Sequence, residues 1–196
     1  MKKFFGFLFF LLFVVESILG YYFVKFEIPK KYIIKVSNLV SFNDKLLFFI
    51  MFILPYIVFF LIWMVPFFVS KKDSKTFLNT SFSFFFTATL VFAFYLLFQT
   101  SILAPHIPPK TVFDKIVLFI YSLNRPSNLF PVQYIIFTIL SNLILFKLNV
   151  KIALLLLPIT SLVIYIYFAI GGITLLSFLV SGIVSLLGFF VFILFS

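Results

Sequence analysis

Few side chains in this 196-residue chain are able to carry out chemistry. There is no cysteine and only one histidine, His106, which excludes a thiol nucleophile, a thiolate metal site and a multi-histidine metal centre. Of the five acidic residues, only Glu16 falls inside a long apolar block. A charge there costs about 2.5–3.5 kcal/mol on insertion scales. Glu16 is therefore either a proton or ion relay, or a protonated or bundle-facing group hydrogen-bonded to a neighbour.

A second group of polar residues precedes the fourth apolar block. Residues 121–134 read YSLNRPSNLFPVQY, with one arginine among turn-forming Pro and Asn residues. Turn chemistry at a membrane surface can produce such a string alone, because Pro and Asn favour turns and Phe anchors in the headgroup layer. Two further segments, FQTSILAP at 98–105 and TSLVIYIYFAIG at 160–171, lie at the ends of other apolar blocks.

In their order, the three segments resemble the signature regions of the type 2 phosphatidic acid phosphatase superfamily, in particular the branch related to inositol phosphorylceramide synthases. That branch carries Y-P-T-x-x-P-R-P, Y-S-L-D-R-P-x-N-x-F-P-S-L-H and S-T-L-F-x-K-Q-H-Y-x-x-D. The resemblance covers roughly residues 81–190, which would form a phosphatase-like core. Residues at matching places are Thr100, Pro105, Tyr121, Ser122, Leu123, Arg125, Pro126, Asn128, Phe130 and Pro131.

The resemblance implies a phosphoryl-transfer site whose reactive groups this chain lacks. In that family an Arg and a Lys hold phosphate, one His protonates the leaving oxygen, and a second His, oriented by an Asp, attacks phosphorus. The degenerate positions here are Ala104 for the Arg, Val132 for a Ser, Tyr134 and Tyr167 for the two His, and Gly171 for the Asp. A phenol with an ordinary pKa of about 10 does not shuttle protons as imidazole does near pH 7. We expect no catalytic residue, although the cations His106, Lys110, Lys115 and Arg125 remain for binding phosphate.

Composition defines the elements that must position these residues. With 64% hydrophobic and only 10% charged residues, the chain is not a soluble globule. About 20 apolar residues cross a hydrocarbon core of about 30 Å, and the alternation of barrel strands is missing. We expect an all-α polytopic membrane bundle of about six transmembrane helices, forming a single domain over residues 1–196. The expected spans are 4–24, 46–69, 81–103, 131–146, 152–170 and 173–195, with an interfacial amphipathic piece at 112–123.

The net charge of +10 is better explained by membrane topology and lipid headgroup contact than by nucleic acid. The short connections carry Lys2, Lys3, Lys71, Lys72, Lys75, Lys147 and Lys151, which favours a cytoplasmic amino terminus, in the plasma membrane. We expect the first block to be a retained helix rather than a cleaved signal peptide, because ESILGYY at 16–22 has no small-x-small cleavage site.

Three functions follow from these observations. The first is a catalytically silent relative of the lipid phosphatases that binds a phospholipid or polyprenyl phosphate headgroup, or supports a protein partner, without cofactor or metal. The second is an active phosphatase or phosphotransferase with a rearranged site, in which His106 is the nucleophile or acid. The third is an unrelated small transporter or membrane assembly protein that works through Glu16.

Overall fold

The computed structural model describes residues 1–26, 32–34, 45–98, 100–102, 132–169 and 175–196. Apart from one pair of three-residue strands, these residues are helical. The helices are α1 (Lys2–Phe26), α2 (Lys45–Ser70), α3 (Ser74–Leu97), α5 (Gln133–Leu148), α6 (Val150–Ala169) and α7 (Leu175–Phe195). The expected all-α architecture is therefore present, and the expected interfacial piece at 112–123 lies outside the described residues.

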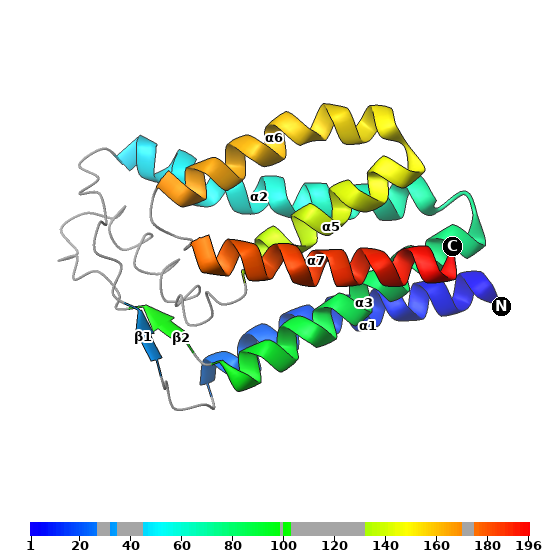
Figure 1. The fold of residues 1–196 in the computed structure, drawn as a ribbon, viewed down its shortest axis with the longest axis horizontal. Coiled ribbons are helices and arrows are strands. Elements are labelled where there is room, and N and C mark those ends of the chain that lie inside the picture. The colour runs from blue at the N-terminus through cyan, green and yellow to red at the C-terminus, as the bar shows by residue number, and fades with distance from the viewer. Residues whose placement is uncertain (27–31, 35–44, 99, 103–131, 170–174) are drawn as a thin grey trace.

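The helices run alternately up and down along one long axis (Figure 1). Met1, the turn between α2 and α3, the turn between α5 and α6, and Ser196 all lie at one end, the terminal end. At the opposite, distal end, α3 finishes at Leu97 and α5 begins at Gln133.

α1 and α3 are parallel neighbours along most of their length. Aromatic rings join them, with the Phe9 and Phe82 centroids 5.1 Å apart and those of Phe13 and Phe84 5.3 Å apart. A Cβ on Gly6 would come within 2.7 Å of the Phe77 ring, so the glycine permits this close packing. Because both helices point the same way, the short strands that follow them, β1 (Tyr32–Ile34) and β2 (Thr100–Ile102), pair in parallel, with Tyr32 opposite Thr100.

α5 is the central helix and packs on α2, α3, α6 and α7. Side chains all around it are fully buried: Ile135, Ile136, Phe137, Thr138, Leu140, Ser141, Ile144 and Leu145 have no exposed surface. A helix that is apolar all round and buried all round belongs in the middle of a bundle. Its 16 residues make it the shortest of the six helices.

α3 begins seven residues earlier than the sequence indicates, at Ser74 rather than 81, and it ends at Leu97 rather than 103. Asp73 caps its start, because the Asp73 carboxylate accepts hydrogen bonds from the backbone N–H groups of Lys75, at 3.3 Å, and Thr76, at 2.9 Å. The polar residues Asn79 and Thr80, which the hydropathy pattern assigns to a turn, are buried inside the bundle.

The bundle has apolar side chains on its outside as well as in its core, and small polar side chains are buried among the core residues. α7 shows the pattern most clearly, since its buried face consists of Ser177, Ser181, Val184, Ser185, Gly188 and Phe192. Its outer face is Leu175, Leu176, Leu179, Ile183, Leu186, Leu187, Phe190, Ile193, Leu194 and Phe195, each at least 45% exposed. A soluble protein rarely exposes a continuous apolar face of this kind. By length and composition, two helices among the described residues, Ser74–Leu97 and Leu175–Phe195, are able to cross a membrane.

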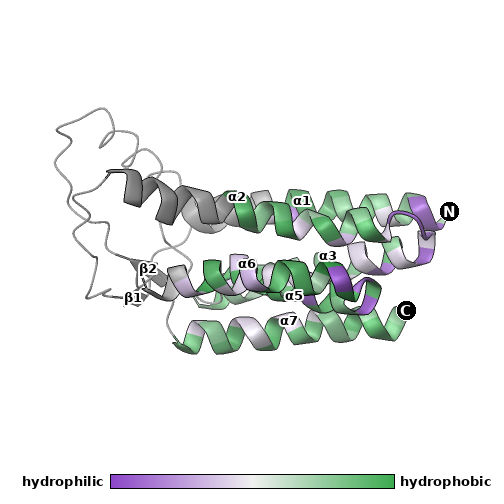
Figure 2. Ribbon diagram, turned by 90° about the horizontal axis from the view of Figure 1, so that it is seen from above, coloured by the Kyte–Doolittle hydropathy of each residue, from purple (hydrophilic) through white to green (hydrophobic). Residues whose placement is uncertain are grey.

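Charged side chains gather at the terminal end, where Figure 2 shows the most hydrophilic ribbon. Seven exposed lysines lie there, namely Lys2, Lys3, Lys71, Lys72, Lys75, Lys147 and Lys151. The one acid that the described residues place among them is Asp73, whose carboxylate is already engaged in capping α3. This end is therefore strongly basic, and the walls of the bundle are apolar.

Candidate functional site

Most of the residues singled out by the sequence fall outside the described part of the chain. These are Ala104, His106, Lys110, Lys115, Arg125 and Gly171. Tyr167 belongs to α6, but its side chain is also outside the described part. The clustering of the degenerate positions around one mouth therefore stays a prediction.

Tyr134 and Val132 are described, and both side chains pack in the core of the bundle. The Tyr134 ring stacks against α2, with its centroid 6.0 Å from that of Phe59 and 6.1 Å from that of Trp63. Val132 is 3% exposed and is the N-cap residue of α5. Its side chain cannot cap the helix, and instead the Val132 backbone N–H donates a 2.9 Å hydrogen bond to Ser181 Oγ of α7.

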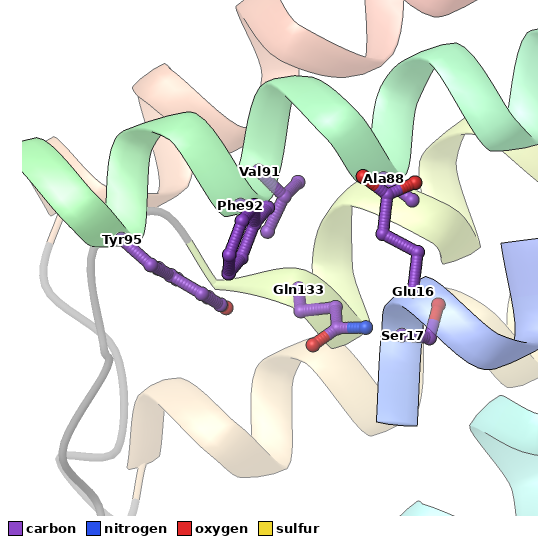
Figure 3. Close-up of a pocket in the computed structure, with 7 residues that line it drawn as sticks. All are labelled: Glu16, Ser17, Ala88, Val91, Phe92, Tyr95 and Gln133. Carbon is purple, nitrogen blue, oxygen red and sulfur yellow. The ribbon is translucent and has the colours of Figure 1, made fainter. Parts of the chain in front are cut away.

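A small pocket lies near the distal end, where α1 and α3 meet the first turn of α5 (Figure 3). Seven residues line it: Glu16 and Ser17 from α1, Ala88, Val91, Phe92 and Tyr95 from α3, and Gln133 from α5. The pocket therefore depends on three helices that are distant in sequence. It has space for about one water-sized sphere.

Glu16 carries the one carboxyl group of this pocket. Thr89 Oγ1 donates a 3.1 Å hydrogen bond to Glu16 Oε2, and it also lies 3.1 Å from the Phe85 carbonyl oxygen of its own helix. This contact joins α1 to α3 and corresponds to the hydrogen-bonded neighbour that the sequence leaves open as one alternative for Glu16. It does not neutralise the charge, because a hydroxyl is uncharged.

Ser17 Oγ is a buried oxygen with no hydrogen-bond partner among the described residues. Serine hydroxyls in helices normally donate to the carbonyl one turn earlier. Ser181 and Ser185 of α7 do so, at 2.7 Å each. Figure 3 shows Ser17 next to Glu16 on α1, and Gln133 reaching toward them from α5.

The pocket offers oxygen donors rather than reactive groups. Within the described ranges there is no group of three or more His, Cys, Asp or Glu side chains that would hold a metal ion. A single carboxylate with nearby hydroxyl and amide groups can bind a cation or a proton, whereas phosphoryl transfer requires a nucleophile together with cations on the phosphate oxygens.

The sequence identifies Glu16 from its position in an apolar block. It gives no signal for Thr89, Tyr95 or Gln133, because these residues come near Glu16 only in the folded bundle.

Comparison with known proteins yields no relative: no protein-family model, no curated protein and no solved structure matches this chain.

Proposed function

We propose that this protein is an integral membrane bundle of six spanning helices that binds the phosphate-bearing head of a phospholipid or polyprenyl phosphate and catalyses no reaction of its own. The observation that supports membrane insertion is the apolar outer surface of the bundle. Large apolar side chains on α1, α6 and α7 face outward, while serines and threonines face inward. In a bilayer the exposed apolar side chains would contact lipid tails, and the inner hydroxyls would join helices by hydrogen bonds.

Helix lengths support six spans. At a rise of 1.5 Å per residue, five helices with 20 to 26 residues are about 30 Å long or longer, enough for a hydrocarbon core. α5 reaches only about 24 Å, but it is enclosed by α2, α3, α6 and α7 and does not need to meet lipid along its length. The seven lysines of the terminal end support a cytoplasmic location for both termini, in the plasma membrane.

The headgroup site belongs to the opposite membrane face in this proposal. The chain that joins α3 to α5 contains His106, Lys110, Lys115 and Arg125, and α3 ends and α5 begins at the distal end. The absence of catalysis rests on Ala104, Val132, Tyr134, Tyr167 and Gly171, which replace the reactive groups of the lipid phosphatases. The stacking of Tyr134 on α2 supports a packing role for that position.

The test uses purified full-length protein in lipid nanodiscs. We expect no inorganic phosphate release from phosphatidate or polyprenyl pyrophosphate, and saturable binding of the same lipids that Arg125→Gln weakens about tenfold, the cost of one charge-assisted contact. Lys147→Gln removes a lysine at the terminal end and should leave this binding unchanged. Absence of saturable binding refutes headgroup recognition. Phosphate release that His106→Ala abolishes would instead support the rearranged phosphatase.

A second function, a small transporter, is favoured by the Glu16 pocket. A charged side chain within a membrane span marks an ion or proton pathway by default. Its test is ion or proton flux in proteoliposomes, which Glu16→Gln should abolish and Asp73→Asn, a change at the surface, should not affect. Absence of flux in the unaltered protein removes this candidate.

A further inference from the structure

The charge of Glu16 has no fixed counter-ion in the described bundle. Glu16 lies about 21 Å further along α1 than Lys2, at a rise of 1.5 Å per residue. The lysines whose side chains the structure describes all lie at the terminal end. Thr89 of α3 is hydrogen-bonded to Glu16, Tyr95 of α3 and Gln133 of α5 line the same pocket, and none of these three side chains carries a positive charge.

The donors around Glu16 suit a hard cation. Glu16 and Ser17 of α1 present a carboxylate and a hydroxyl oxygen, which are ligands that alkali ions prefer, and Tyr95 and Gln133 line the same pocket. The Ser17 oxygen is buried and has no hydrogen-bond partner in the described part of the chain. Buried polar atoms normally have such a partner, and a bound cation would supply one here. A single carboxylate balances one positive charge, which favours a monovalent ion over Ca²⁺ or Mg²⁺.

Size restricts the ligand further. The pocket has space for about one water-sized sphere, which matches a single small ion. An ion of the size of Na⁺ fits this space between the Glu16 carboxylate, which reaches toward α3 beside Ala88, and the Ser17 hydroxyl, which lies on α1 (Figure 3).

We propose that the pocket between α1, α3 and α5 is a binding site for one Na⁺-sized alkali ion, held by Glu16 and Ser17 and linked to α3 through Thr89. The ion would neutralise Glu16 and hold α1, α3 and the start of α5 together. This site does not depend on headgroup binding, because it lies among different residues and takes a ligand of opposite charge.

The experiment measures the melting temperature of full-length protein in nanodiscs of neutral lipid as NaCl replaces N-methyl-D-glucamine chloride at constant ionic strength. A site-specific ion stabilises the folded state in a saturable way. At ten times the dissociation constant we expect the melting temperature to rise by about 3–6 °C. Glu16→Gln should abolish the rise and Ser17→Ala should shift its midpoint to higher Na⁺. Asp73→Asn, the matched change of a carboxylate outside the pocket, should leave the response as it is.

Each outcome decides the proposal. Saturation by Na⁺ that Glu16→Gln removes supports it, and weaker saturation by the larger Cs⁺ supports the size argument. If Glu16→Gln does not fold, the response of the unaltered protein together with the Ser17→Ala midpoint supplies the answer. No Na⁺ response in the unaltered protein overturns the proposal. So does a response that persists unchanged in Glu16→Gln, or a response to pH alone, which would mean that a proton neutralises Glu16.

Discussion

Gly188 lies where the backbone of α7 packs directly against a side chain of α3. A Cβ at this position would lie 2.1 Å from Thr87 Oγ1 and 3.3 Å from a Leu140 methyl carbon of α5. The same approach allows Ser83 Oγ to donate a 2.7 Å hydrogen bond to the Gly188 carbonyl oxygen. The glycine is therefore required by packing rather than by backbone conformation, and it joins three helices at one point.

Gly188→Ala should lower the free energy of unfolding by about 1–3 kcal/mol, because the added methyl group must displace Thr87. Gly182→Ala is the matched control on the same helix, since nothing lies within 4 Å of the Cβ position there. The control should change stability by less than about 1 kcal/mol, in the stabilising direction. Chemical unfolding in detergent measures both values, and equal effects would contradict this packing.

Trp63 is the only tryptophan in the chain, and its environment can be measured directly. Its Nε1–H donates a 3.1 Å hydrogen bond to Thr138 Oγ1 of α5. Thr138→Val should shift the fluorescence emission to shorter wavelength, because the indole loses its polar partner, and should cost about 0.6–1.5 kcal/mol. Thr89→Val removes a hydroxyl that faces α1 instead, so an equal shift in that variant would contradict the assignment.

The sequence predicts the importance of Glu16 but not its environment. An acid inside an apolar block is visible from composition alone, whereas its partner Thr89 is 73 positions away and reaches it only because α1 and α3 pack in parallel. Ser17 has no distinguishing feature in the sequence. Its lack of a partner is a property of the folded bundle.

At the scale of elements, the sequence predicts the helices better than their ends. The helix expected over 4–24 is observed as Lys2–Phe26 and the helix expected over 152–170 as Val150–Ala169, close to the predicted limits. α3 is the exception, because its first turns are polar and hydropathy assigns them to a loop. Asn79 shows why this fails: its side chain is buried and its Nδ2–H donates a 2.6 Å hydrogen bond to the Phe195 carbonyl oxygen at the end of α7. In this bundle small polar residues such as Asn79 and Thr80 are buried, so low hydropathy alone does not mark a connection.

The cap of α3 should make stability depend on pH. Hydrogen bonds from the Thr76 side chain, and then from the backbone N–H groups of Thr76 and Lys75, lower the pKa of Asp73 below its ordinary value of 3.8. A carboxylate with a lowered pKa in the folded state contributes its stabilisation fully above the ordinary value, and loses it as the pH falls through the folded-state pKa.

Asp73→Ala should therefore lower the melting temperature at pH 7, and the difference from the unaltered protein should shrink as the pH falls below the ordinary value of 3.8. Asp73→Asn is the control, because Asn caps helices but does not titrate. Melting curves of the three proteins from pH 7 to about pH 3 give the comparison. A difference between Asp73→Ala and the unaltered protein that is constant with pH would show that the cap does not act through its charge.

At the scale of the whole molecule, the order of apolar blocks predicts the alternation of helices but not their packing. The fourth block is the shortest and looks marginal in the sequence, yet it forms α5, the most enclosed helix. Its sides match four neighbouring helices, and this match places it in the centre. On the α7 side, Ser185 Oγ lies 2.9 Å from the Ile136 carbonyl oxygen, within hydrogen-bond distance. Such complementarity involves residues 49 positions apart and leaves no local pattern.

The basic terminal end predicts the orientation of the bundle in a membrane. Because the chain contains no cysteine, single cysteines can be introduced without background labelling. Lys72→Cys and Asn149→Cys place a thiol in the two exposed turns of the terminal end, and Phe98→Cys places one just beyond α3 at the distal end. With the positive end in the cytoplasm, a membrane-impermeant maleimide added to intact cells should label only Phe98→Cys, and the other two should react after permeabilisation. Labelling of both Lys72→Cys and Asn149→Cys in intact cells would show that the bundle has the opposite orientation. Labelling of one of them alone would show that α5 and α6 do not traverse the membrane as proposed.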